Sequence, residues 1–264
     1  MSLENKMLFL LDMDGTIYLD NLLFDGTLDF LSRVREKGAR YVFLTNNSSK
    51  STEAYVQKLS SIGIDSSEDD FLTSTDATAL YIRNEFPAIK FYAMGTRSFV
   101  SQLKRLGVDV TNEFTDEIQG IVIGNDTELT FEKLDFVCRI LTERNVPYIA
   151  TNPDYVCPTE FGSVPDCGSV CDMLYNVSKR RPIFIGKPSK LMPELAMDKT
   201  GYTREQTAVI GDRIYTDIKS GINAGVTTVL VMSGETTYEI LNQSRDKPDY
   251  VMESAKEIID ELKK

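Results

Sequence analysis

Short apolar or β-branched segments alternate with segments of helical periodicity along almost the whole chain. This alternation is typical of βαβ units, in which helices connect the strands of a parallel sheet. Strands are expected near residues 8–12, 41–45, 91–94, 120–123, 148–151, 183–185, 208–210 and 228–231. Helices are expected over segments such as 52–62, 97–106, 131–144, 189–200 and 216–224. The sequence therefore predicts an α/β fold built on parallel sheet.

The first predicted strand ends on two carboxylates. The run Met7–Leu11 is apolar, and Asp12 and Asp14 follow it with one residue between them. Two carboxylates about 4 Å apart repel by roughly 4 kcal/mol at an effective dielectric constant near 20. A divalent cation turns that repulsion into attraction, and Mg²⁺ prefers carboxylate oxygens. The alternative is a solvated Asp-Gly turn, the usual meaning of a single Asp-Gly pair.

Three further predicted strands also end in polar side chains, and parallel α/β sheets bind ligands at this end of their strands. Thr45 and Asn46 precede a helix and offer an anion a hydroxyl, an amide and backbone N–H groups. Lys187 follows another strand, and Asp212 follows a third, with Asp217 near the start of the next helix. The alternative for Thr45 and Asn46 is a simple helix N-cap. Lys187 could instead be a solvated side chain, and Asp217 could be only a helix-start residue.

The chain of 264 residues contains no histidine. Ser-His-Asp and Cys-His nucleophile systems are therefore excluded, as are all histidine metal sites. Acid-base chemistry in an enzyme of this composition must fall to Asp, Glu, Lys, Tyr or Cys.

Charge and hydropathy restrict the partners and the location. The formal net charge of −11 argues against a nucleic-acid or anionic-membrane partner, because the dominant electrostatic term would be repulsive. The longest apolar run is too short to span a bilayer and lacks the flanks of a signal peptide, so a cytoplasmic location is expected. The cysteines lack the paired spacing of a zinc site and are expected to be buried, unpaired thiols. They are Cys138, Cys157, Cys167 and Cys171.

The order of these polar strand ends resembles the haloacid dehalogenase-like (HAD) superfamily of phosphohydrolases. Asp12 and Asp14 match its first motif, DxDGT, and Thr45 its second. Lys187 matches the third, and the spacing from Asp212 to Asp217 matches the fourth, GDxxxxD. The match extends from Leu8 to about Gly234. The resemblance implies a Rossmann-like parallel-sheet core.

The resemblance also implies a role for each matched residue. Asp12 would attack phosphorus and form an aspartyl phosphate, and Asp14 would act as general acid and then as general base. Thr45, the Asn46 backbone and Lys187 would neutralise the phosphoryl oxygens. The ligands of Mg²⁺ would be the Asp12 side chain, the Asp14 backbone carbonyl and Asp212, with Asp217 steadying the metal-bound waters.

The segment between the second and third motifs is far longer than one βαβ crossover needs. Residues 80–181 have their own alternation of strands and helices, and are predicted to form a smaller α/β domain inserted into a core of residues 1–79 and 182–264. In the superfamily, an α/β cap at this place is the C2 type. The TNPD sequence at 151–154 and the GKP sequence around Lys187 resemble subclass IIA, which includes NagD-like, 4-nitrophenyl, phosphoglycolate and pyridoxal phosphatases. Relatives with this cap often pair through it, so a homodimer is a further expectation.

The loop 151–168 is the candidate for the face of the cap that selects the substrate. Asn152 and Asp154 could hydrogen-bond a polar substrate, and Asp166 stands where relatives commonly carry glycine. A carboxylate at that place, if it faced the site, would disfavour strongly anionic leaving groups. The alternatives are a loop held by its own Asx turns and an Asp166 that points to solvent.

Together these observations predict a Mg²⁺-dependent phosphatase of small phosphate monoesters. Its substrates would include 4-nitrophenyl phosphate in vitro and sugar, nucleotide or other metabolite phosphates. Three alternatives stay open: a receiver-like signalling domain that keeps a phosphorylated aspartate, a phosphate-ester-binding protein without turnover, and a phosphomutase of the same superfamily.

Overall fold

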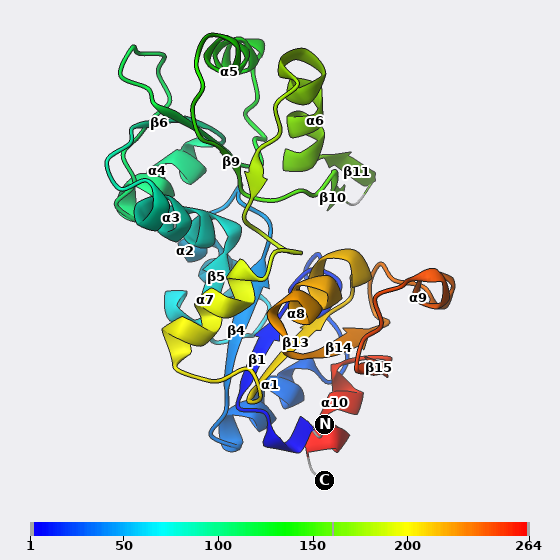
Figure 1. Ribbon diagram of the computed structural model, residues 1–264. Coiled ribbons are helices and arrows are strands. Elements are labelled where there is room, and N and C mark those ends of the chain that lie inside the picture. The colour runs from blue at the N-terminus through cyan, green and yellow to red at the C-terminus, as the bar shows by residue number, and fades with distance from the viewer. Residues whose placement is uncertain (1–2, 160, 263–264) are drawn as a thin grey trace. The chain divides into compact units, whose positions relative to one another are not determined.

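The structure of the chain, a computed structural model, describes residues 3–159 and 161–262 (Figure 1). The chain divides into two compact units. The core unit comprises Met1–Thr45, Thr52–Leu72 and Lys187–Lys264, and the inserted unit comprises Asn46–Ser51 and Thr73–Gly186. The predicted domain boundaries near residues 80 and 181 stay a prediction.

The core sheet has six strands in the order β15-β14-β13-β1-β4-β5. The strands are β1 (Leu8–Leu11), β4 (Arg40–Thr45), β5 (Phe71–Thr73), β13 (Thr207–Gly211), β14 (Thr227–Val231) and β15 (Tyr250–Met252). Strand β1 pairs in parallel with both β13 and β4, so that Leu11 lies level with Ile210 and Phe43. The chain segments that follow these three strands therefore leave the sheet at the same edge.

Helices cover both faces of this sheet. The helical segments of the core unit are η1 (Leu3–Asn5), α1 (Thr27–Glu36), α2 (Thr52–Ser61), η2 (Glu68–Asp70), α7 (Leu191–Thr200), η3 (Ile214–Ile218), α8 (Lys219–Ala224), α9 (Tyr238–Gln243) and α10 (Ala255–Leu262). Phe9 and Phe43 share one buried cluster with residues of α1, α2 and α10. Leu230 faces the other way and packs against η3. A short antiparallel hairpin of β2 (Tyr18–Leu19) and β3 (Leu22–Leu23) follows β1.

The inserted unit has its own parallel sheet, in the order β12-β9-β8-β6-β7. The strands are β6 (Phe91–Met94), β7 (Val110–Thr111), β8 (Gly120–Ile123), β9 (Tyr148–Ala150) and β12 (Ile183–Phe184). The helices are α3 (Ser74–Glu85), α4 (Arg97–Arg105), α5 (Phe131–Glu143) and α6 (Cys167–Ser178). An antiparallel pair, β10 (Val156–Thr159) and β11 (Gly162–Pro165), precedes α6.

The predicted α/β fold with two parallel sheets is confirmed, and each predicted strand coincides with an observed one. The predicted helix 216–224 differs, because its first turn is the π-helix η3 and only the remainder is α-helical. Cys167 and Cys171 are buried as expected, whereas Cys138 and Cys157 are partly exposed.

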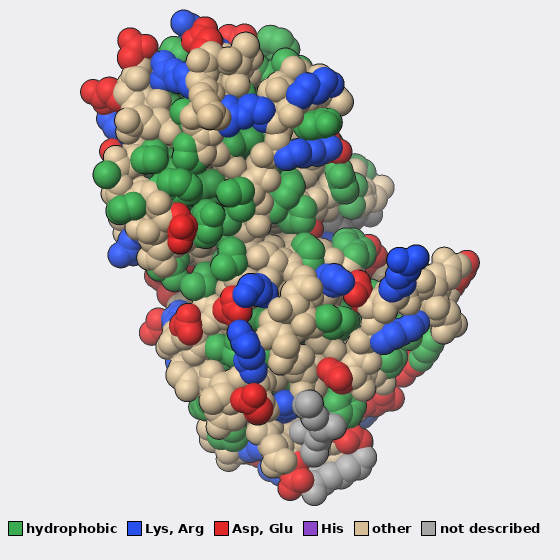
Figure 2. All heavy atoms as spheres, in the orientation of Figure 1, with side chains coloured by type: hydrophobic (Ala, Val, Ile, Leu, Met, Phe, Trp, Pro, Cys, Tyr) green, Lys and Arg blue, Asp and Glu red, His purple; other side chains and the backbone are tan. Residues whose placement is uncertain are grey.

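The described part of the chain contains no helix that is both long and apolar enough to cross a membrane. On the face shown in Figure 2, Lys and Arg side chains are interspersed with Asp and Glu side chains. This face thus carries both signs of charge, although the formal net charge of the chain is −11.

Candidate active site

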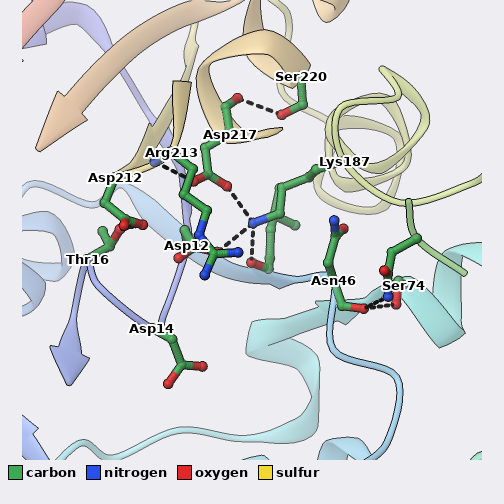
Figure 3. Close-up of polar contacts among 12 residues, drawn as sticks. Asp12, Asp14, Thr16, Asn46, Ser74, Lys187, Asp212, Arg213, Asp217 and Ser220 are labelled. Carbon is green, nitrogen blue, oxygen red and sulfur yellow. Dashed lines mark hydrogen bonds and ion pairs between the residues drawn. The ribbon is translucent and has the colours of Figure 1, made fainter. Parts of the chain in front are cut away.

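Three carboxylates converge at the edge of the core sheet where β1 and β13 end, of which Asp212 and Asp217 are buried and Asp12 is half-buried. Asp12 follows β1, Asp212 follows β13, and Asp217 lies in η3. Each offers an oxygen that lies within 4.8 Å of the others. Figure 3 shows the three side chains pointing toward one another. The parallel pairing of β1 with β13 is what brings the first and last of the predicted motifs together.

Burial and mutual repulsion disfavour the charged form of these carboxyl groups. Burial, with the nearby Asp217, raises the pKa of Asp12 well above its usual range, although Lys187 acts in the opposite direction. Burial and Asp217 likewise raise the pKa of Asp212 to about 6. The cluster is therefore poised to gain from a positive charge placed among its oxygens.

Lys187 supplies one such charge. Its Nζ donates hydrogen bonds to Asp12 Oδ1 at 2.5 Å, to Asp217 Oδ1 at 2.6 Å and to the Leu44 carbonyl at 3.2 Å. Burial alone would lower the pKa of this amine, but Asp12 and Asp217 outweigh burial and raise it. Lys187 therefore stays charged and compensates two of the three carboxylates (Figure 3).

Asp212 is held by main-chain and side-chain donors from two loops. The Glu235 backbone N–H donates to its Oδ2 at 2.7 Å, and the Thr16 hydroxyl lies 3.4 Å from its Oδ1. The chain before Thr16 passes so close that a Cβ on Gly15 would lie 2.6 Å from Asp212 Oδ2. Gly15 also has a φ of +92°, in the region that favours glycine.

A second group of polar residues surrounds Asp212 and was not predicted from the sequence. Arg213 forms an ion pair with Glu235 at 2.9 Å, and Tyr215 donates a hydrogen bond to the same glutamate at 2.6 Å. The Arg213 backbone N–H donates to Asp217 Oδ2 at 3.1 Å. The position of Arg213 directly after Asp212 in the fourth motif is the one signal that could have pointed to it.

Asp14 differs from the three clustered carboxylates because its side chain is 48% exposed. In Figure 3 its carboxylate points away from the cluster. Lys58 Nζ lies 3.6 Å from Asp14 Oδ1, and the Tyr18 hydroxyl donates to Asp14 Oδ2 over a long 3.5 Å. Burial, with the nearby Asp14, raises the pKa of Tyr18, so this phenol keeps its proton.

Thr45 is the last residue of β4 and Asn46 follows it, but the two residues belong to different units. Thr45 is buried at the end of β4. Asn46 belongs to the inserted unit, where its Nδ2 donates to Asp154 Oδ2 at 3.0 Å. Its carbonyl accepts hydrogen bonds from the Ser74 hydroxyl at 2.6 Å and from Asn152 Nδ2 at 2.7 Å.

The three residues predicted to select the substrate make hydrogen bonds within the inserted unit. Asn152 is fully buried, and its Oδ1 accepts a bond from the Asp154 backbone N–H at 3.0 Å, which closes an Asx turn. Asp166 is the N-cap of α6 and accepts a bond from the Cys167 backbone N–H. These bonds match the structural alternative for Asn152, and the role of all three residues in substrate selection stays a prediction.

The donor set of the cluster fits a hard divalent cation. Asp12, Asp212 and Asp217 offer only carboxylate oxygens, and burial makes their shared negative charge costly without a cation. A carboxylate at the end of a buried strand, a buried lysine and a more exposed second carboxylate also provide a nucleophile, a fixed positive charge and a proton carrier.

Comparisons with known proteins agree with this arrangement. Two family models match the chain, one described as haloacid dehalogenase-like hydrolase over residues 9–109 and one as HAD-hydrolase-like over residues 184–258. An acid sugar phosphatase of Staphylococcus haemolyticus is 33% identical over 262 residues, which are 99% of this chain and 98% of that protein.

Solved structures resemble the whole chain. The crystal structure of a 4-nitrophenylphosphatase from Thermotoga maritima is 38% identical, with a TM-score of 0.93 over 98% of each chain. NagD from Escherichia coli K-12 is 27% identical, with a TM-score of 0.87 over 96% of this chain and 98% of NagD. These similarities cover both units.

Proposed function

Because the chain belongs to the haloacid dehalogenase-like hydrolases, in the group of NagD-like and 4-nitrophenyl phosphatases, we propose that it hydrolyses small phosphate monoesters with Mg²⁺. The observation that carries this proposal is the convergence of Asp12, Asp212 and Asp217 around the Lys187 ammonium. The arrangement supplies a carboxylate nucleophile, oxygen ligands and a fixed positive charge at one edge of the sheet.

Asp12 is the proposed nucleophile. Its Oδ1 is held by Lys187, which fixes the plane of the carboxylate at the end of the buried strand β1. Its Oδ2 would form a bond to phosphorus while the bond from phosphorus to the leaving oxygen breaks. The product of this step would be an aspartyl phosphate, and the leaving group would depart with its electron pair.

Asp14 is the proposed proton carrier. As a carboxylic acid it would give its proton to the leaving oxygen, and as a carboxylate it would then take a proton from the water that attacks the aspartyl phosphate. The partial exposure of Asp14, in contrast to the buried cluster, supports a role at the side of the site where a leaving group departs.

The proposed Mg²⁺ ligands are the Asp12 side chain, the Asp14 backbone carbonyl and Asp212, with Asp217 steadying the metal-bound waters. When bound, the ion would neutralise phosphoryl oxygens and align the ester for in-line attack. Asp212 is prepared for this role because Glu235 N–H and Thr16 fix the orientation of its carboxylate.

Lys187, the Thr45 hydroxyl and the Asn46 backbone N–H are the proposed donors to the phosphoryl group. Negative charge spreads over the equatorial oxygens as phosphorus transfers, and fixed donors stabilise that charge. Lys187 is already held in place by Asp12, Asp217 and the Leu44 carbonyl, and one of these three hydrogen bonds would be exchanged for one to a phosphoryl oxygen.

We further propose that residues 80–181 act as a cap, with Asn152, Asp154 and Asp166 contributing to substrate choice. The acid sugar phosphatase and the 4-nitrophenylphosphatase among the relatives favour sugar phosphates and aryl phosphates as the first substrates to test. A homodimer formed through the cap and a cytoplasmic location belong to the same proposal. The receiver-like, non-catalytic and phosphomutase alternatives are outcomes of the test below.

Hydrolysis of 4-nitrophenyl phosphate tests the reaction class. Turnover is expected with Mg²⁺, and both EDTA and Asp12→Asn should reduce it to background, because each removes part of the nucleophile and metal site. Asp246→Asn, an acidic-residue change in another part of the core unit, should keep the activity. Steady turnover by Asp12→Asn would contradict the mechanism.

A stable phosphoprotein after treatment with acetyl phosphate, with little turnover, would instead favour the receiver-like alternative. Tight binding of phosphate esters without turnover would favour the non-catalytic one, and isomerised sugar phosphates would favour a mutase. A panel of phosphorylated metabolites, ranked by kcat/KM, would then identify the preferred leaving group.

A further inference from the structure

Lys58 lies outside the four motifs, yet it contacts the carboxylate that the proposed mechanism uses for proton transfer. We propose that Lys58, seated on the ring of Tyr18, is a positioning residue that holds the Asp14 carboxylate in the orientation needed for proton transfer. The inference rests on the proposed function, since it assigns a role in the same reaction.

Three contacts form a closed triangle. Lys58 Nζ lies 3.6 Å from Asp14 Oδ1 and 3.9 Å from the centroid of the Tyr18 ring. The Tyr18 hydroxyl lies 3.5 Å from Asp14 Oδ2. Each carboxylate oxygen of Asp14 thus has its own partner, and the two partners contact each other. This arrangement restricts rotation of the carboxylate more than either contact would alone.

Both partners of Asp14 stand on rigid supports. Tyr18 is fully buried, and the Gly15 backbone N–H donates to the Tyr18 carbonyl at 2.9 Å, which ties the turn after Asp14 to β2. Lys58 lies in the last turn of α2, between the buried Tyr55 and Leu59, which anchor that helix in the core cluster. Buried side chains therefore hold both Tyr18 and the helix that carries Lys58 in place.

An ordinary surface ion pair would not carry this inference, because exposed pairs contribute roughly 0 to 1 kcal/mol and are often mobile. The Lys58 side chain is only 22% exposed, and its ammonium lies over an aromatic ring, which adds a cation–π attraction. Asp14 itself is 48% exposed and would otherwise rotate among several rotamers. Proton transfer needs the donor within hydrogen-bond reach of the leaving oxygen, so fixing that rotamer affects the rate.

The test compares leaving groups. 4-Nitrophenolate leaves without a proton, whereas an alkoxide needs one, so only the second reaction depends strongly on Asp14. Lys58→Met should lower kcat/KM for the best unactivated phosphate ester of the panel by about 30-fold, and for 4-nitrophenyl phosphate by less than about 3-fold. Lys58→Arg should restore most of the loss because it keeps the charge over the ring.

Matched variants separate positioning from general damage. Lys199→Met removes another lysine of the core unit that also lies 3.6 Å from a carboxylate, that of Asp69, and should leave both substrates unaffected. Tyr18→Phe keeps the ring and removes only the hydroxyl, so it should give a smaller loss with the same leaving-group dependence. This variant also tests the inference if Lys58→Met does not fold.

The double variant gives the sharpest outcome. In an Asp14→Asn background, Lys58→Met should add less than about a 2-fold loss on the alkyl ester, since the group that it positions is already gone. Equal losses on both substrates, or a full additional loss in that background, would overturn the inference. A wild-type protein that hydrolyses neither ester contradicts the proposed function instead, whereas an active wild type with a fully active Lys58→Met contradicts only the role of Lys58.

Discussion

At the scale of single residues, the main feature of the site is how the negative charges of its carboxylates are compensated. Lys187 offsets Asp12 and Asp217 through direct ion pairs. Asp212 instead accepts hydrogen bonds from the Glu235 N–H and Thr16, and the positive charges of Arg213 and Lys187 act on it from nearby. Its pKa of about 6 shows that these donors do not fully offset burial. A cation bound among these oxygens would therefore favour the charged forms of both Asp212 and Asp12.

The orientation of Asp212 depends on the absence of a side chain at Gly15. Gly15→Ala should lower Mg²⁺ affinity at least about 10-fold, because the new Cβ would lie 2.6 Å from Asp212 Oδ2 and would displace this ligand. Calorimetric titration with Mg²⁺ measures the change.

Gly38→Ala is the matched control for this substitution. Gly38 also has a positive φ, of +73°, but a Cβ at this position would have no heavy atom within 4 Å. Gly38→Ala should therefore show only the stability loss of a strained backbone, about 1 kcal/mol, with unchanged Mg²⁺ affinity. Equal Mg²⁺ affinity in both variants and in the wild type would refute the role of Gly15.

At the scale of secondary-structure elements, most strands of the two parallel sheets could be predicted because they are short apolar runs, and some of them end at a polar residue. β1 and β13 are two examples, and their polar ends supply Asp12 and Asp212. What the sequence did not reveal depends on tertiary contacts. The donor from Glu235 is a backbone N–H, which has no residue signature. Lys58 meets Asp14 through a tertiary contact in which its ammonium also lies over the Tyr18 ring of β2.

The helix α6 gives a case in which one side chain has two candidate roles. Asp166 caps the helix through the Cys167 N–H, and it was also predicted to influence substrate choice. Asp166→Ala should destabilise the inserted unit by about 1 kcal/mol, because it removes the N-cap. Asp166→Asn should keep most of that stability, because an amide oxygen can still accept the bond.

Thermal unfolding together with kcat/KM over the substrate panel separates the two roles. If Asp166 acts only as a cap, Asp166→Asn will leave the ranking of substrates unchanged. If it also faces the substrate, the same variant will improve the relative kcat/KM of the more anionic esters, because a negative charge is removed. A ranking that shifts away from anionic esters would contradict the predicted electrostatic role.

At the scale of the whole molecule, two parallel sheets are built from one chain, and the first two motif segments are separated from the last two by a unit with its own core. The core unit gathers Asp12, Lys187, Asp212 and Asp217 from distant parts of the sequence. Folding of the core unit is thus what creates the cluster, and the free energy of unfolding must include the cost of burying its charges.

That cost predicts how stability depends on pH and on Mg²⁺. The folded-state pKa of Asp212 is about 6, against an ordinary value of 3.8, and that of Asp12 is also raised. At a pH between 3.8 and about 6, Asp212 keeps its proton in the folded state but has lost it in the unfolded state. The free energy of unfolding therefore falls as the pH rises from about 4 to 6. For Asp212 alone the loss is on the order of 2 to 3 kcal/mol.

Mg²⁺ should remove this penalty, because the cation replaces the proton among the carboxylates. The rise in Tm on adding Mg²⁺ to EDTA-treated protein should therefore be small at pH 4.5 and amount to several degrees at pH 7.5. Asp212→Asn should abolish most of the rise at pH 7.5 and reduce the pH dependence without metal by the share that Asp212 contributes, whereas Asp246→Asn should change neither. A Mg²⁺-induced rise of equal size at both pH values would show that protons and Mg²⁺ do not compete for the same carboxylates, and would refute the proposed cation site.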